Sequence, residues 1–139
     1  MSRLSIAALL ALALSTAACN NNTTTSPTST PSSTTVTDTF NGTLTRNGAA
    51  NFAFNVSAAG AVYATLTSVS DPSVPVTMSL GIWTAASSVC SVVITNDSAL
   101  QGAILAGSAS GIGQLCVRVS DPVGAIANPV DYQITVVHY

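Results

Sequence analysis

The stretch LCVRVSDPVGAIANPVDYQITVVHY, residues 115–139, decides the fold. Apolar and polar residues alternate over residues 115–120 and again over residues 132–137. A period of two places one side of a β-strand in a core and the other side in water. Asp121-Pro122 lies between the two segments and indicates a turn, because Asp can hydrogen-bond nearby backbone while Pro fixes φ. The stretch therefore predicts two strands that pack on one side only.

The same alternation occurs earlier in the chain, over residues 52–56, 62–67 and 76–83. Turn signals separate the segments: Arg46-Asn47-Gly48, Ala59-Gly60, Asp71-Pro72, Asn96-Asp97 and Asp121-Pro122. No segment after the first 37 residues has an amphipathic helical period. The pattern indicates seven or eight short antiparallel strands separated by turns. It predicts an all-β sandwich of about one hundred residues, which we place at residues 38–139.

Charged side chains are few, and their types exclude one class of partner. The chain contains no Lys and no Glu. The charges of the predicted sandwich are two arginines and five aspartates: Arg46, Arg118, Asp38, Asp71, Asp97, Asp121 and Asp131. Because phosphate binding needs clustered basic residues, we do not expect nucleic acid as a partner.

Residues 1–18 have the layout of a secretory signal peptide. Arg3 gives a basic start, residues 6–14 are uninterrupted apolar, and residues 15–18 are small. A membrane-spanning helix needs about 20 apolar residues, so cleavage is favoured over permanent spanning. We therefore expect an exported protein.

Thr16-Ala17-Ala18-Cys19 resembles the lipobox of bacterial lipoproteins, with Thr where that motif usually has Leu. The resemblance implies that Cys19 is the first mature residue and carries acyl groups such as palmitate, which anchor the protein in a membrane. Asn20 is not the aspartate that retains many lipoproteins at the inner membrane, so the outer membrane is expected if the host has two. Ordinary cleavage near Ala18, which leaves a free thiol, is the alternative.

Residues 19–37 are predicted to be a disordered tether. They consist almost entirely of Asn, Thr, Ser and Pro, so burial cannot offset the entropy lost on ordering them. A coil of this length spans about 25 Å. We expect it to hold the sandwich away from the lipid surface.

With Cys19 assigned to lipid, Cys90 and Cys116 remain as a pair in an oxidising compartment. A disulfide between them would stabilise the folded state by about 3.5 kcal/mol on the chain-entropy model, because it closes a loop in the unfolded chain. Two cysteines and the single, distant His138 favour no metal site, and no cofactor is expected.

The folded region resembles bacterial pre-peptidase C-terminal (PPC) domains. Four stretches carry the resemblance: residues 40–44, 51–56, 115–119 and 132–136. It implies a small jelly-roll-like sandwich, usually an accessory to secreted enzymes and sometimes a binder of collagen or polysaccharide.

Three departures from that family pattern matter. The loop over residues 108–113 is expected to be longer than the family's tight turn, and no peptidase domain accompanies the module, which we expect to stand alone. Some collagen-binding relatives hold calcium with acidic residues, whereas this chain has no Glu and no dense Asp cluster. Asp97 with its polar neighbours falls short of the six to eight ligands that calcium takes, so a turn is favoured there.

Catalysis is not expected. His138 continues the inward phase of the last predicted strand, no G-x-S-x-G motif occurs, and Lys and Glu are absent. A periplasmic hydrolase is therefore the least favoured function. The expected function is a non-catalytic binding or accessory module for a polysaccharide or a protein.

Three aromatic residues are the candidate ligand contacts: Trp83, Tyr63 and Tyr139. They fall on the phase opposite the core pattern, and exposed aromatic rings can stack on sugars or peptides. Each could instead cover a sheet edge or pack beneath a loop. The alternative function is a structural or self-assembling cell-surface protein whose sheet edges pair with neighbouring copies.

Overall fold

The computed structural model describes residues 34–139, and these form eight β-strands joined by turns. The strands, in chain order, are β1 (Val36–Leu44), β2 (Ala49–Val56), β3 (Gly60–Val69), β4 (Val76–Thr84), β5 (Val89–Ala99), β6 (Ile104–Ala109), β7 (Gly113–Ser120) and β8 (Val130–His138). No helix within residues 34–139 is long and apolar enough to cross a membrane.

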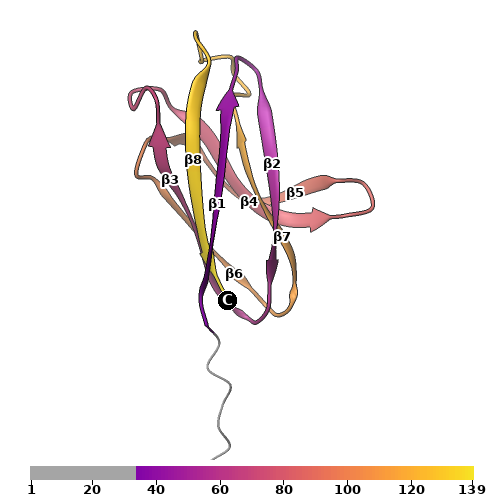
Figure 1. Cartoon of the computed structure of the whole chain (residues 1–139). Helices are drawn as coiled ribbons and strands as arrows, with labels where there is room; N and C mark the ends of the chain where they lie inside the picture. Colours follow the sequence, from indigo (N-terminus) through magenta and orange to yellow (C-terminus); the bar gives the residue numbers. More distant parts are fainter. Residues whose placement is uncertain (1–33) are drawn as a thin grey trace, which may run out of the picture. The chain divides into compact units, whose positions relative to one another are not determined.

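The strands form two four-stranded antiparallel sheets (Figure 1). Sheet A has the order β1-β8-β3-β6, and sheet B has the order β2-β7-β4-β5. The first strand thus pairs with the eighth, the second with the seventh, the third with the sixth and the fourth with the fifth. A long hairpin wound into two sheets gives this order, which is the jelly roll. The predicted all-β, jelly-roll-like sandwich is confirmed.

The core lies between the two sheets and is built by the alternation noted in the sequence. In β8, for example, every second residue from Val130 to His138 is buried. The largest fully buried apolar side chains come from both sheets and from the loop after β7: Leu44, Leu66, Met78, Ile126 and Ile134. Burying one such side chain contributes about 1.5–3 kcal/mol, so the two inward faces hold the sandwich together.

All five alternating segments of the sequence are strands, namely β2, β3, β4, β7 and β8. The turn predicted at Asn96-Asp97 is wrong, because both residues lie within β5. β5 is an edge strand, and the Asn96 side chain accepts the backbone N–H of Ser98 at 3.1 Å. On an edge, a turn-forming side chain can satisfy backbone groups without ending the strand.

Two boundaries also differ from expectation. Val36 and Thr37 belong to β1, where they pair with His138 and Val137 of β8, so the sandwich begins slightly before residue 38. The long loop expected over residues 108–113 is short, because its first residues end β6 and its last residue begins β7. The predicted signal peptide and lipidated Cys19 lie outside the described residues, as does the tether up to residue 33.

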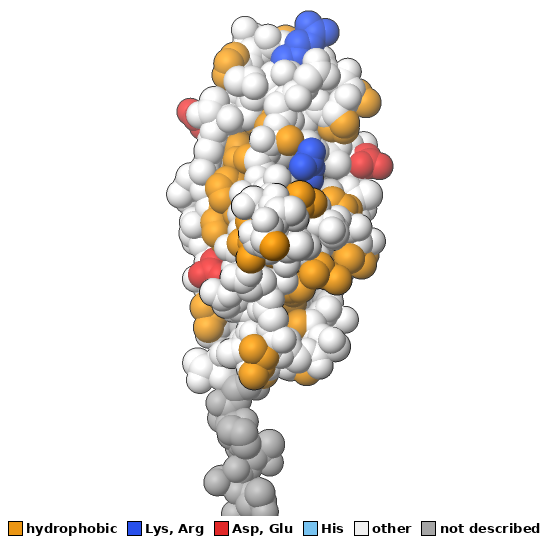
Figure 2. All heavy atoms as spheres, turned by 90° about the vertical axis from the view of Figure 1, so that its right-hand side faces the viewer, with side chains coloured by type: hydrophobic (Ala, Val, Ile, Leu, Met, Phe, Trp, Pro, Cys, Tyr) orange, Lys and Arg blue, Asp and Glu red, His pale blue; other side chains and the backbone are white. Residues whose placement is uncertain are grey.

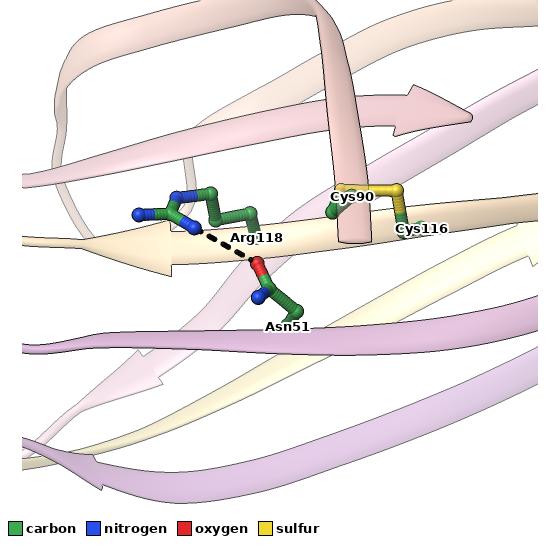
Figure 3. Close-up of a disulfide and its surroundings, with 4 residues drawn as sticks. All are labelled: Asn51, Cys90, Cys116 and Arg118. Carbon is green, nitrogen blue, oxygen red and sulfur yellow. Dashed lines mark hydrogen bonds between the residues drawn. A yellow bond between two sulfur atoms is a disulfide. The ribbon is translucent and has the colours of Figure 1, made fainter. Parts of the chain in front are cut away.

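Cys90 and Cys116 form the predicted disulfide, with Cα atoms 5.8 Å apart (Figure 3). Cys90 lies on β5 and Cys116 on β7, which are separated in sheet B by β4. The bond therefore does not join the two sheets. It fastens the start of β5 to a strand of its own sheet.

Candidate functional site

The three candidate aromatic residues lie on different sheets. Trp83 is near the end of β4 in sheet B and is partly buried. Tyr63 is on β3 in sheet A, 47% exposed, and Tyr139 directly follows β8 in the same sheet. The Tyr139 ring packs against Gly60, where a side chain would overlap it. Tyr139 therefore covers the start of β3. Tyr63 is the most exposed of the three, and Trp83 and Tyr139 are both partly buried.

Trp83 lines a groove of about 760 Å³, here called the Trp83 groove. Its walls come from β4 and β5 on one side and from β6, β7 and their connection on the other. Buried Val56 and Val62 form part of its floor. Ile82, 55% exposed, and Ile112, 85% exposed, stand at its rim. A concave site with an apolar lining of this size is the usual form of a ligand-binding cleft.

Polar groups border the same groove. Ser108 and Ser110 bring hydroxyl groups from β6 and from the connection to β7. Gln114 is exposed beside them, and its amide donates to the Asn55 side chain at 3.0 Å. No residue lining the groove is charged. The groove thus offers an aromatic ring, apolar walls and neutral hydrogen-bonding groups.

The hairpin of β4 and β5 forms one wall of the groove and projects from sheet B (Figures 1 and 2). At its base the Ser91 carbonyl lies where a side chain on Gly81 would be, so only glycine permits this crossing of the two strands. The disulfide at Cys90 fastens the same point to β7. Apolar side chains gather around the projecting hairpin in Figure 2. Gly81 and the disulfide together hold this wall in place.

Beside the disulfide, the outer face of sheet B carries one of the two arginines of the sandwich. Arg118 Nη1 donates to the Asn51 side-chain oxygen at 3.2 Å, across the β2–β7 pair (Figure 3). This hydrogen bond orients the guanidinium group along the sheet. Arg118 does not line the groove.

A second, more polar depression of about 550 Å³ lies on sheet A. Asn41, Asp131 and Gln133 line it together with the hydroxyl-bearing Ser68 and Ser70. Its polar groups bond one another: Gln133 donates to Asn41 at 3.0 Å, and the Asp131 N–H donates to Ser70 at 3.0 Å. No exposed aromatic ring lines this depression. It lacks the stacking surface that Trp83 gives the groove.

His138 is 1% exposed, as its inward phase predicted. Its Nε2 lies 3.0 Å from Asp38 Oδ2, and its ring centroid is 5.0 Å from that of Phe54. The pair joins β8 to the start of β1. His138 lines neither the groove nor the depression on sheet A. This arrangement accounts for the histidine as a packed, hydrogen-bonded core residue.

The Asp-Pro turns have the predicted local chemistry. Asp71 accepts the N–H of Ser73 at 3.1 Å and its hydroxyl at 2.6 Å, and these bonds lower the pKa of Asp71. Asp121 accepts the N–H groups of Ala125 and Ile126 at 2.8 and 3.0 Å. Within residues 34–139, no three His, Cys, Asp or Glu side chains lie together as metal ligands.

The groove itself was not predicted from the sequence. Ile82 has the same phase as the buried Val76, Met78 and Leu80, but its side chain is exposed. It is the last residue of β4 that pairs with β7, and it still pairs with β5. Ile112 is a single apolar residue among Ser and Gly, which is the one local signal for an exposed contact residue. No protein-family model matches the chain, and comparison with curated proteins found no similar sequence.

Proposed function

We propose that this protein is a non-catalytic, lipid-anchored module of the bacterial cell envelope that binds a polysaccharide in the Trp83 groove. The observation that carries the proposal is the position of Trp83 in an uncharged groove bordered by hydroxyl and amide groups. Sugar rings present apolar C–H faces and a rim of hydroxyl groups. An aromatic ring flanked by neutral hydrogen-bonding side chains complements both.

The fold supports this proposal over an enzymatic one. The jelly roll is a common lectin architecture, and the resemblance to PPC domains implies an accessory, polymer-binding role. His138 is bonded to Asp38 away from the groove, and the groove holds no acid, base or charged group. General acid–base catalysis needs such a group within hydrogen-bonding reach of the substrate. Binding alone needs none.

The anchoring part of the proposal rests on the sequence of the N-terminal region. Acylated Cys19 would hold the module at the membrane, with residues 20–33 as spacer. Mass spectrometry of the mature protein is expected to find Cys19 as the first residue with acyl groups attached. A mature chain that begins with an unmodified Cys19, or that is cut elsewhere, would contradict anchoring but leave groove binding untouched.

Groove binding is tested by retention on insoluble polysaccharides with the Cys19→Ser chain, which carries no lipid. We expect the chain to be retained by one member of a panel of cell-wall and extracellular polysaccharides. Trp83→Ala should weaken retention by about fivefold or more, because the stacking of a nucleobase on an aromatic ring is worth about 1–3 kcal/mol and we expect a similar size for a sugar ring.

Tyr63→Ala is the matched control, since Tyr63 is an exposed aromatic residue on the other sheet. It should leave retention unchanged. Equal losses in both variants, or no retention of the unsubstituted chain by any polymer, would overturn the proposed site. Circular dichroism and melting curves confirm that each variant is folded.

A further inference from the structure

β5 is the longest strand of the sandwich and an edge strand of sheet B. Within the sheet it pairs with β4 alone. An edge strand presents a row of backbone N–H and C=O groups that another strand can pair with. Such an edge therefore tends to pair with a second chain unless a structural feature prevents it.

The two halves of β5 differ in the features that protect the edge against pairing. The second half carries Asp97, and its Ser98 N–H is bonded by the Asn96 side chain. Charged residues and side-chain caps of this kind are the usual protection of an edge. The first half, residues 89–93, contains no charge, no Pro and no such cap, and its one irregularity is at Val93, where the pairing with β4 shifts register. It exposes three valines instead: Val89 at 49%, Val92 at 48% and Val93 at 66%.

The first half of β5 is also held in a fixed conformation. The disulfide binds Cys90 to β7, and the Ser91 backbone crosses directly over Gly81. The segment is therefore an ordered strand before it meets a partner. Less conformational entropy is lost on association when the binding strand is already ordered.

Charge favours a second copy of this chain as the partner. The described residues carry five aspartates and two arginines, so each copy has a net negative charge and two copies repel where their aspartates meet. Residues 72–96 carry no charged side chain. Two copies can approach through this segment without desolvating or opposing a charge.

We propose that two copies of the chain associate through residues 89–93 of β5, paired antiparallel about Ser91. Identical strands paired antiparallel are related by a two-fold axis, so the contact is closed and yields a dimer. Sheet B then continues from one copy into the next, and Val89 of each copy lies opposite Val93 of the other. This inference does not depend on polysaccharide binding.

The test is sedimentation velocity of the Cys19→Ser chain over a range of concentrations, without sugar. We expect a monomer–dimer equilibrium. Val92→Lys should raise the dimer dissociation constant at least tenfold, because it places like charges across the two-fold axis and lysine protects an edge.

Val123→Lys is the matched control, since Val123 is 83% exposed in the connection between β7 and β8, away from β5. It should leave the dimer unchanged. A chain that stays monomeric up to about 1 mM would overturn the proposal, and so would equal effects of the two lysines.

Hydrogen exchange provides a readout that needs no variant. In the unsubstituted chain, backbone amides of residues 89–93 should gain protection as the concentration rises, while those of β2, the other edge of sheet B, should not. Protection that is independent of concentration, or that rises at β2 instead, would contradict pairing through β5.

Discussion

Asp121 connects two neighbouring loops at one end of the sandwich through a single carboxylate. The side chain is 2% exposed and accepts backbone N–H groups from both sides: Ala125 and Ile126 after β7, and Asn47 in the turn between β1 and β2. Burial alone would raise the pKa of Asp121, but the N–H groups of Ile126, Ala125, Asn47 and Gly124 together outweigh it, and the pKa is lowered. The ionised form is thus the one that the fold stabilises.

This carboxylate should make stability depend on pH. Because the pKa is lower in the folded state, the stabilisation is present above the ordinary Asp value near 4 and is lost as pH falls through the lower folded value. Asp121→Asn should therefore be less stable than the unsubstituted chain at pH 7, and the difference should shrink as pH falls below the ordinary Asp value near 4.

Chemical denaturation at a series of pH values measures this difference. Asp97→Asn serves as control, because Asp97 is exposed on β5, and its effect should be small at every pH. If the deficit of Asp121→Asn were the same at pH 3 and pH 7, the ionised carboxylate would not be the source of the stabilisation.

Single residues also show where local sequence signals succeed. Asp71 and Asp121 were predicted as turn residues, and both bond backbone within a few residues of their own position. Asn96-Asp97 has the same composition but lies in a strand. The difference is that β4 pairs with β5 at this point, where Asn96 lies opposite Met78. A signal that depends on neighbouring residues alone cannot detect a pairing partner so far away in the sequence.

At the scale of elements, strand prediction followed burial. β2, β3 and β8 have one buried face, which produces the alternation seen in the sequence. β4 and β7 alternate as well, because the residues on their second face are mostly polar or small even where they are buried, as at Ser79, Cys116 and Ser120. β5 is an edge strand with residues exposed on both faces, so its sequence does not alternate clearly. β6 does alternate in burial, but Ile104 lies on its exposed face and Gly107 on its inward face, so the sequence hides the pattern. A period-of-two analysis cannot find a strand whose two faces meet the same environment.

The β4–β5 hairpin is the element whose position depends on the disulfide. Each sheet already packs on the other through its own inward face, and the bond joins two strands of one sheet. Removing the bond should therefore free the hairpin while leaving the sandwich folded.

The variant Cys90→Ala/Cys116→Ala tests this expectation. It should keep a β-sheet circular dichroism spectrum at 25 °C, with Tm lower by roughly 15–25 °C, since about 3.5 kcal/mol is lost and each kcal/mol shifts Tm by about 4–8 °C. Limited proteolysis should cut the variant first at the hairpin. An unfolded variant, or first cleavage in another connection, would show that the disulfide supports the sandwich as a whole.

For the molecule as a whole, the sequence predicted the class of fold and the disulfide, because both follow from periodicity and cysteine count. It also predicted that Trp83, Tyr63 and Tyr139 point away from the core. It could not predict which of them share a surface. That depends on strand order, which places Trp83 in sheet B and the two tyrosines in sheet A.

Strand order also creates the Trp83 groove. β5 and β6 are consecutive in the chain but are edges of different sheets, so the sandwich is open on the side where they meet. The groove is lined by residues of β4, β5, β6 and β7 from this side. We propose that a polysaccharide binds in this groove and not on the face of sheet A.

The most direct measurement is an NMR titration of the ¹⁵N-labelled Cys19→Ser chain with a soluble oligosaccharide cut from the polymer that retains it. The account predicts chemical-shift changes at the Trp83 indole N–H and at the backbone amides of Ile82, Ser110 and Ile112, with Tyr63 unchanged. Shifts confined to Tyr63 and its neighbours on sheet A, or no shifts at saturating sugar, would contradict it.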